Sequence, residues 1–208
     1  MKKIMFNDRY GLTRAVLEGR KTQTRRIVPD RLWKQWEMFK SLRDSPRIRD
    51  ERDYFLLHSA YKFGEVVAVA QNYQDARVQF LPEEDEEFGC YNWPAEQTGG
   101  WGNKMFVRAD LMPHHIRIKD VRVERLQDIS QDDCLAEGVQ PCSGTCEGLY
   151  WCDGINGGGE HFGDPISPRV FSSPKVAYAA LIDAISGKGT WERNPYVFVN
   201  NFQLWLDI

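Results

Sequence analysis

The chain has 208 residues, of which 42% are hydrophobic, and this is enough to form one folded domain with insertions. Its 27 basic and 30 acidic residues give a net charge of −3. The protein therefore has no overall positive charge that would attract long nucleic acids, and any contact with them must be local. No apolar run reaches the roughly 18 residues that span a bilayer, and five cysteines are an odd and modest number for a disulfide framework. We therefore expect a cytoplasmic protein that makes no membrane contact.

The first predicted helix covers residues 8–18, where apolar residues recur at helical spacing and Gly19 would end it. An extended basic segment follows. A second helix is predicted up to about residue 42, and residues 43–53 are predicted to be a loop. The aromatic residues of the second helix should belong to the core: Trp33, Trp36 and Phe39.

Strands are predicted at residues 66–70, 104–108, 117–126 and 196–202, from apolar runs or from alternation of apolar and polar residues. Ser130 should begin a helix by capping the amide of Asp133, and Gly138 should end it just after Glu137. Another helix is predicted from Ser173 and Pro174 to Gly187. Short strands of uneven spacing among helices favour a mixed fold built on a closed or nearly closed barrel.

The densest group of anion-binding side chains lies between residues 19 and 26, which read Gly-Arg-Lys-Thr-Gln-Thr-Arg-Arg. Residues 1–30 contain eight basic and three acidic side chains, a local excess of five positive charges. In a strand, Thr24 and Arg26 would share one face, and Lys21 and Arg25 the other, unless a turn at Lys21 brings it to Thr24. Such a patch can hold a phosphate or a polar base. The alternative is a solvated basic edge strand.

The segment Gly19-Arg20-Lys21-Thr22-x-Thr24-x-Arg26 resembles the N-terminal signature of the ASCH domain family. Further blocks occur in the order of the phage- and prophage-associated branch of that family, above all residues 121–138 and Asn194-Pro195-Tyr196-Val197. The resemblance implies an α+β fold, a PUA-like β-barrel decorated by short helices. We expect a single domain over residues 1–208, with insertions at about 30–62, 81–103 and 140–173, of which the second is indicated by its acidic cluster.

Small bacterial ASCH proteins include amidohydrolases that remove the acetyl group from N4-acetylcytidine with a Lys, a Thr and a Glu. The resemblance implies that Lys21 is the base, Thr24 the nucleophile, and Glu137 a proton shuttle or an orienting group. Arg26 or a backbone amide would stabilise the oxyanion. No cofactor is implied.

The expected partner is RNA or a modified nucleoside, and its binding residues are expected to be Arg20, Arg25, Arg26, Gln71 and Tyr73. Gln71 stands where relatives of the phage-like branch usually have a carboxylate. An amide can hydrogen-bond a base edge but cannot accept a proton, which favours the alternative of a non-catalytic module that binds RNA or a modified base. A phage-encoded interaction protein is the third hypothesis.

A zinc site is the weakest candidate. Cys142, Cys146, Cys152 and His161 lie within 20 residues of an irregular segment, and three thiolates with an imidazole can hold zinc tetrahedrally. Their spacing lacks the close cysteine pair of zinc ribbons and fingers. We therefore predict no metal.

Overall fold

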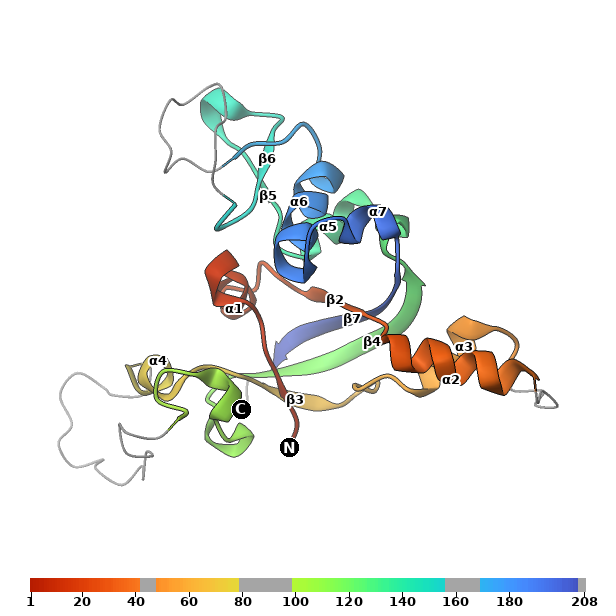
Figure 1. Ribbon diagram of the computed structural model, residues 1–208. Coiled ribbons are helices and arrows are strands. Elements are labelled where there is room, and N and C mark those ends of the chain that lie inside the picture. The colour runs from red at the N-terminus through yellow and green to blue at the C-terminus, as the bar shows by residue number, and fades with distance from the viewer. Residues whose placement is uncertain (42–47, 79–98, 156–168, 206–208) are drawn as a thin grey trace.

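The computed structural model describes residues 1–41, 48–78, 99–155 and 169–205. Its centre is a five-stranded mixed sheet with the strand order β1-β3-β4-β7-β2 (Figure 1). β1 runs parallel to β3, and the other neighbours are antiparallel. The strands are β1 (Lys3–Ile4), β3 (Val66–Val69), β4 (His115–Arg125), β7 (Tyr196–Trp205) and β2 (Gln23–Ile27), and a separate pair is formed by β5 (Gln140–Pro141) and β6 (Tyr150–Trp151).

The sequence predicts a closed or nearly closed barrel, whereas the sheet is open and does not form a closed barrel. β1 and β2 are its two edges, and no backbone ladder joins them in the part of the chain that the structure describes. β1 has only two residues, and the chain then turns at Asn7 into the 3-10 helix η1 (Asp8–Tyr10), which leaves no strand to pair with β2. A side chain bridges the edges instead, because the Arg26 guanidinium of β2 donates to the carbonyl oxygen of Met5.

Helices cover both faces of the sheet (Figure 1). Successive side chains of a strand point to opposite faces, and β7 therefore contributes to two cores. Val197 and Val199 join the main core together with α6, whereas Tyr196 and Phe198 pack with residues of α2 and α3. The α-helices are α1 (Leu12–Leu17), α2 (Asp30–Ser41), α3 (Glu51–Leu57), α4 (Tyr73–Val78), α5 (Gln131–Ala136), α6 (Pro174–Ser186) and α7 (Thr190–Arg193).

Several predicted features are confirmed. The mixture of helices and strands is as expected, and the predicted strands over 66–70, 117–126 and 196–202 correspond to β3, β4 and β7. Ser130 caps α5 by accepting a hydrogen bond from the Asp133 amide at 3.0 Å. Trp36 is buried, with Trp33 and Phe39 packed beside it, so the core role of these aromatic residues is also confirmed.

Three local predictions are wrong. Residues 104–108 do not form a strand, because the Asn103 side chain caps the Met105 amide and begins the 3-10 helix η3 (Lys104–Phe106). The predicted loop over 43–53 ends too late, because α3 (Glu51–Leu57) already begins in it, with Asp50 as the cap. The irregular segment 140–173 contains β5, β6 and η6 (Gly144–Cys146) in its described part. Most of the insertion at 81–103 lies outside the described residues.

Candidate functional site

The turn after α1 directs Lys21 toward α5. Gly19 has a φ of +73°, a left-handed conformation that glycine adopts without a steric penalty, and it reverses the chain. The Lys21 amide then donates to the carbonyl oxygen of Ala15 at 2.9 Å, and the Thr22 amide donates to that of Ala136 at 2.9 Å. The two backbone bonds fix the start of the basic segment between the ends of α1 and α5.

Glu137 is held at the C-terminal end of α5, where it is the last residue before a glycine. Gly138 has a φ of +106°, and a Cβ atom added there would lie 3.5 Å from Leu12 and 3.9 Å from the Lys21 side chain. The strain of a side chain at this φ, more than the contacts, explains why a glycine follows Glu137. The glycine lets the chain turn away while the carboxylate points to Lys21.

Lys21 and Glu137 form a buried ion pair. The Lys21 Nζ lies 2.5 Å from the Glu137 Oε2 and also donates to the Glu137 carbonyl oxygen at 2.7 Å. Their side chains are 1% and 5% exposed, so water does not screen the pair. One residue thus binds the ammonium through its side chain and its backbone.

Arg25 anchors the other side of Glu137. Its Nη1 lies 3.2 Å from the Glu137 Oε1, and its Nη2 lies 2.6 Å from the Glu124 Oε1 and 2.9 Å from the Asp133 Oδ2. Arg122 of β4 binds both Glu124 and Asp133 in turn. Arg122 also lies 3.6 Å from the Asp120 Oδ2, so with Lys21 the network joins three cations to four carboxylates.

Burial lowers the pKa of Lys21 below the ordinary value of 10.5, although Glu137 opposes this effect. Arg26 and Arg25 lower the Lys21 pKa further through their positive charges. Loss of hydration disfavours the charged form of a buried amine. Lys21 can therefore become a neutral amine, and hence a base, more readily than a surface lysine.

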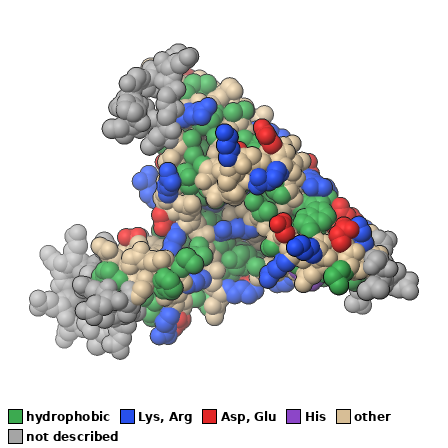
Figure 2. Space-filling model, viewed as in Figure 1, with side chains coloured by type: hydrophobic (Ala, Val, Ile, Leu, Met, Phe, Trp, Pro, Cys, Tyr) green, Lys and Arg blue, Asp and Glu red, His purple; other side chains and the backbone are tan. Residues whose placement is uncertain are grey.

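A cavity of about 290 Å³ lies beside the ion pair. Its polar wall holds Lys21, Thr24, Arg26 and Glu137, and its apolar wall is formed by α6 and the residues around α1: Phe6, Leu12, Leu181, Ile182 and Ile185. The volume is at the lower end of the roughly 300–1,000 Å³ of small-molecule sites. In Figure 2, Lys, Arg and hydrophobic side chains occur together across the middle of the face seen there, between the upper helices and the sheet.

Thr24 lies in the middle of β2 and is 5% exposed. Thr24 lines the same cavity as Lys21 and Glu137, so the structure brings the three predicted catalytic residues to one cavity. No described residue makes a side-chain hydrogen bond to the Thr24 hydroxyl. The hydroxyl is therefore available to a ligand in the cavity.

The predicted binding residues divide into two groups. Arg25 and Arg26 line the cavity, whereas Arg20 does not and instead pairs with Glu18 at 2.6 Å. Gln71 and Tyr73 lie in another part of the fold, around a separate small core. The backbone N–H of Gln71 donates to the Met112 sulfur at 3.3 Å, and the buried Tyr73 hydroxyl accepts from the backbone N–H of Arg108 at 2.8 Å. The structure does not bring Gln71 or Tyr73 to the cavity.

Tyr178 is a cavity residue that sequence reasoning missed. It is 2% exposed, and burial, followed by the charge of Glu137, raises its pKa well above 10.0. Its hydroxyl therefore stays protonated and can donate to a ligand. The signal was present, because Pro174, Ala177, Tyr178, Leu181 and Ile182 form a buried stripe at the spacing of an amphipathic helix.

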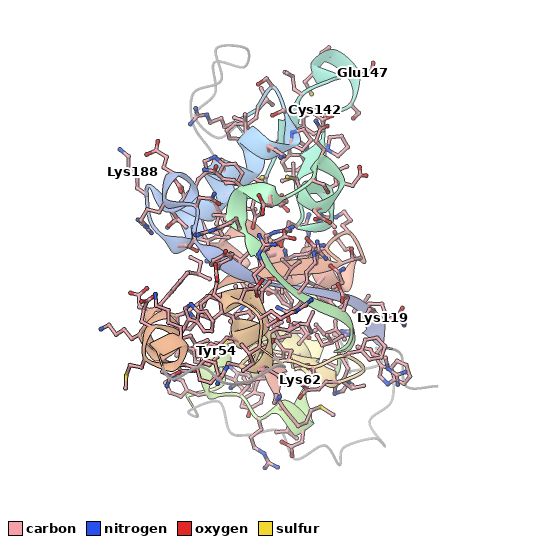
Figure 3. The ribbon with its side chains drawn as sticks, turned by 90° about the vertical axis from the view of Figure 1, so that its right-hand side faces the viewer. Tyr54, Lys62, Lys119, Cys142, Glu147 and Lys188 are labelled. Atoms are coloured by element: carbon pink, nitrogen blue, oxygen red, sulfur yellow. The ribbon has the colours of Figure 1, made fainter. Side chains whose placement is uncertain are left out.

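The candidate zinc ligands do not form a cluster among the described residues. Cys152 is buried in the main core, where its Sγ donates to the Ala177 carbonyl oxygen at 3.7 Å. Burial, and then Cys146, raise the pKa of Cys142 to about 11, so its thiol stays protonated at neutral pH. Figure 3 shows Cys142 and Glu147 at one end of the molecule, far from Tyr54. The described residues contain no group of three or more possible metal ligands, and His161 lies outside them.

No family model matches this chain, and no curated protein or solved structure is significantly similar to it. The ASCH resemblance therefore rests on the sequence motifs alone. Within the described ranges, none of the helices is both long and apolar enough to cross a bilayer.

Proposed function

We propose that this chain is an ASCH protein with a PUA-like fold that hydrolyses the acyl amide of a nucleoside-sized substrate, of which N4-acetylcytidine is the first to test. The observation that carries the proposal is the buried Lys21–Glu137 pair, which lines one small cavity together with Thr24. A base, a hydroxyl and a carboxylate in one small site are the parts that acyl transfer needs.

In the proposed reaction, neutral Lys21 accepts the proton of the Thr24 hydroxyl as the Thr24 oxygen attacks the acyl carbon. The carbon–nitrogen bond then breaks, and Lys21 passes the proton to the leaving amino group of the base. Water next attacks the Thr24 ester, gives a proton to Lys21, and releases the carboxylic acid while Thr24 regains its proton. Glu137 holds the Lys21 amine in position throughout through its 2.5 Å contact.

Gln71 does not weigh against hydrolysis at this cavity, because it is absent from the cavity wall. The missing carboxylate at position 71 therefore removes no proton acceptor from the site.

The direct test is to incubate the purified protein with N4-acetylcytidine and to separate cytidine and acetate from the substrate by chromatography. Release of both products supports the proposal, and an unchanged substrate after long incubation contradicts it. A parallel titration with short single-stranded RNA tests the second candidate function, binding without turnover. The exposed Arg26 at the cavity favours that candidate, since it is a cation that a nucleic acid can reach.

The rate of hydrolysis should rise with pH and then level off. Lys21 accepts a proton only as the neutral amine, and its lowered pKa places the midpoint of the rise below 10.5. As the pH falls through this pKa, the amine is protonated and activity is lost. The measurement is kcat/KM as a function of pH, and a profile that is flat between about pH 5 and about pH 10 would contradict the role of Lys21.

Replacing Tyr178 by phenylalanine should lower kcat by about 10²-fold with little change in KM, if its hydroxyl donates to the oxyanion of the acyl group. No side-chain hydrogen bond joins this hydroxyl to another described residue, so the thermal midpoint should stay the same. Tyr61→Phe is the matched control, because the Tyr61 hydroxyl donates to the Lys3 carbonyl oxygen and does not line the cavity. Equal kcat values for the two variants would exclude the role of Tyr178.

A further inference from the structure

The outer edge of β2 is open along the cavity. β2 pairs with β7 from Gln23↔Asn201 to Ile27↔Val197, and it has no strand on its other side among the described residues. Edge strands present backbone N–H and C=O groups that can bind another molecule. The register shows which of these groups face outward.

Just beyond the two ends of β2, the Phe202 amide donates to the Thr22 carbonyl oxygen at 2.8 Å, and the Val28 amide donates to that of Tyr196 at 2.9 Å. In an antiparallel pair, residues alternate between positions that exchange backbone hydrogen bonds and positions that do not. With the continuous register, Thr24 and Arg26 therefore direct their backbone groups to β7. Arg25 and Ile27 direct theirs to the free edge.

The cavity lies along this edge. Four consecutive residues of β2 line it, from Thr24 to Ile27. Because successive side chains point to opposite faces of a sheet, a cavity over one face would touch every second residue. Contact with all four indicates that the cavity follows the edge of the strand. The opposite wall consists of α6 and residues 5–7, and no hydrogen bond from them reaches the backbone of Arg25 or Ile27.

We propose that the backbone N–H and C=O of Arg25 recognise the base of the ligand, as a neighbouring strand would. A pyrimidine such as cytosine carries an acceptor next to a donor, which matches one outward-facing residue. Ile27 directs a second backbone N–H and C=O to the free edge. The inference rests on the proposed nucleoside ligand but not on its hydrolysis.

Two observations favour a small base over a phosphate or a peptide. The buried cations Lys21 and Arg25 are already matched by carboxylates, which leaves Arg26 alone among the described cavity cations to attract a phosphate. The volume of about 290 Å³ suits a nucleoside-sized ligand and is too small for an added peptide strand. The apolar side chains of α6 can then contact the flat face of the base.

The test is amide hydrogen exchange by NMR on the full chain, with and without cytidine, the product of the proposed reaction. Cytidine should slow the exchange of the Arg25 amide by at least about tenfold. The amides of Thr24 and Arg26 are the internal control, because they already bond to β7 and should be protected in both samples. Saturating cytidine that leaves the Arg25 exchange unchanged, or no binding of cytidine at all, would overturn the proposal.

A second ligand gives an independent measurement. N4,N4-dimethylcytidine lacks the amino hydrogens that would reach the Arg25 carbonyl oxygen, and it should bind about tenfold more weakly than cytidine. Equal affinities would count against recognition by the edge. If Arg25 becomes protected while N4-acetylcytidine stays intact, the edge inference stands and hydrolysis fails. If N4-acetylcytidine is hydrolysed while the Arg25 amide stays unprotected, hydrolysis stands and the edge inference fails.

Discussion

Replacing Glu137 by leucine is expected to lower the free energy of unfolding by about 3–5 kcal/mol, because it leaves a buried charge without its partner. Lys21 would keep only its bond to the carbonyl oxygen of residue 137. Arg25 would lose one of its three carboxylates. The midpoint and slope of urea-induced unfolding measure this loss.

The expected loss of stability differs between the Glu137 and the Lys21 variants. Lys21→Met leaves Glu137 paired with Arg25, so its cost should be smaller, about 1–3 kcal/mol. Gln131→Ala is the control, since Gln131 is exposed on the same helix and should change stability by less than about 0.5 kcal/mol. A loss below about 1 kcal/mol for Glu137→Leu would contradict a buried, mutually dependent pair.

The double variant separates the pair from its surroundings. Two apolar side chains in place of a buried ion pair are often tolerated well, because neither leaves a charge behind. Lys21→Met with Glu137→Leu should therefore be less destabilised than the sum of the single variants. Strict additivity would mean that the two residues do not interact in the folded state.

The sequence predicts elements best where a segment is apolar throughout or along one face. The runs that became β3, β4 and β7 are of this kind, and so is α6. α3 and α4 are harder to predict, because α3 begins with three charged residues and α4 is short, with polar residues at half of its positions. Whether the sheet closes into a barrel could not be predicted from the sequence, since this depends on how far β1 extends before the turn at Asn7.

The residues of the site could also be predicted from the sequence only in part. Lys21 and Glu137 are 116 residues apart, and no periodicity relates them, so their pairing was expected only through the family resemblance. Arg25 was expected to bind a ligand, yet its side chain is fully buried and holds three carboxylates. Its free groups are those of the backbone, which depend on strand register and cannot be derived from residue types.

Thr24→Val is expected to lower kcat with N4-acetylcytidine by a factor of about 10³ or more, because valine keeps the shape of threonine but lacks the attacking oxygen. Thr24 makes no side-chain hydrogen bond to a described residue, so the variant should fold with an unchanged thermal midpoint. Cytidine should still bind, which separates the loss of chemistry from the loss of the site. The measurements are the rate of acetate release and the Kd for cytidine.

Thr22→Val is the matched control for Thr24→Val. Thr22 lies two residues away on the same segment but is exposed and does not line the cavity, so its variant should keep kcat within about twofold. If Thr24→Val retains more than about a tenth of the activity while Lys21→Met is inactive, the attacking oxygen belongs to water activated by Lys21. Thr24 would then serve only to shape the cavity, and the acyl-enzyme step would be wrong.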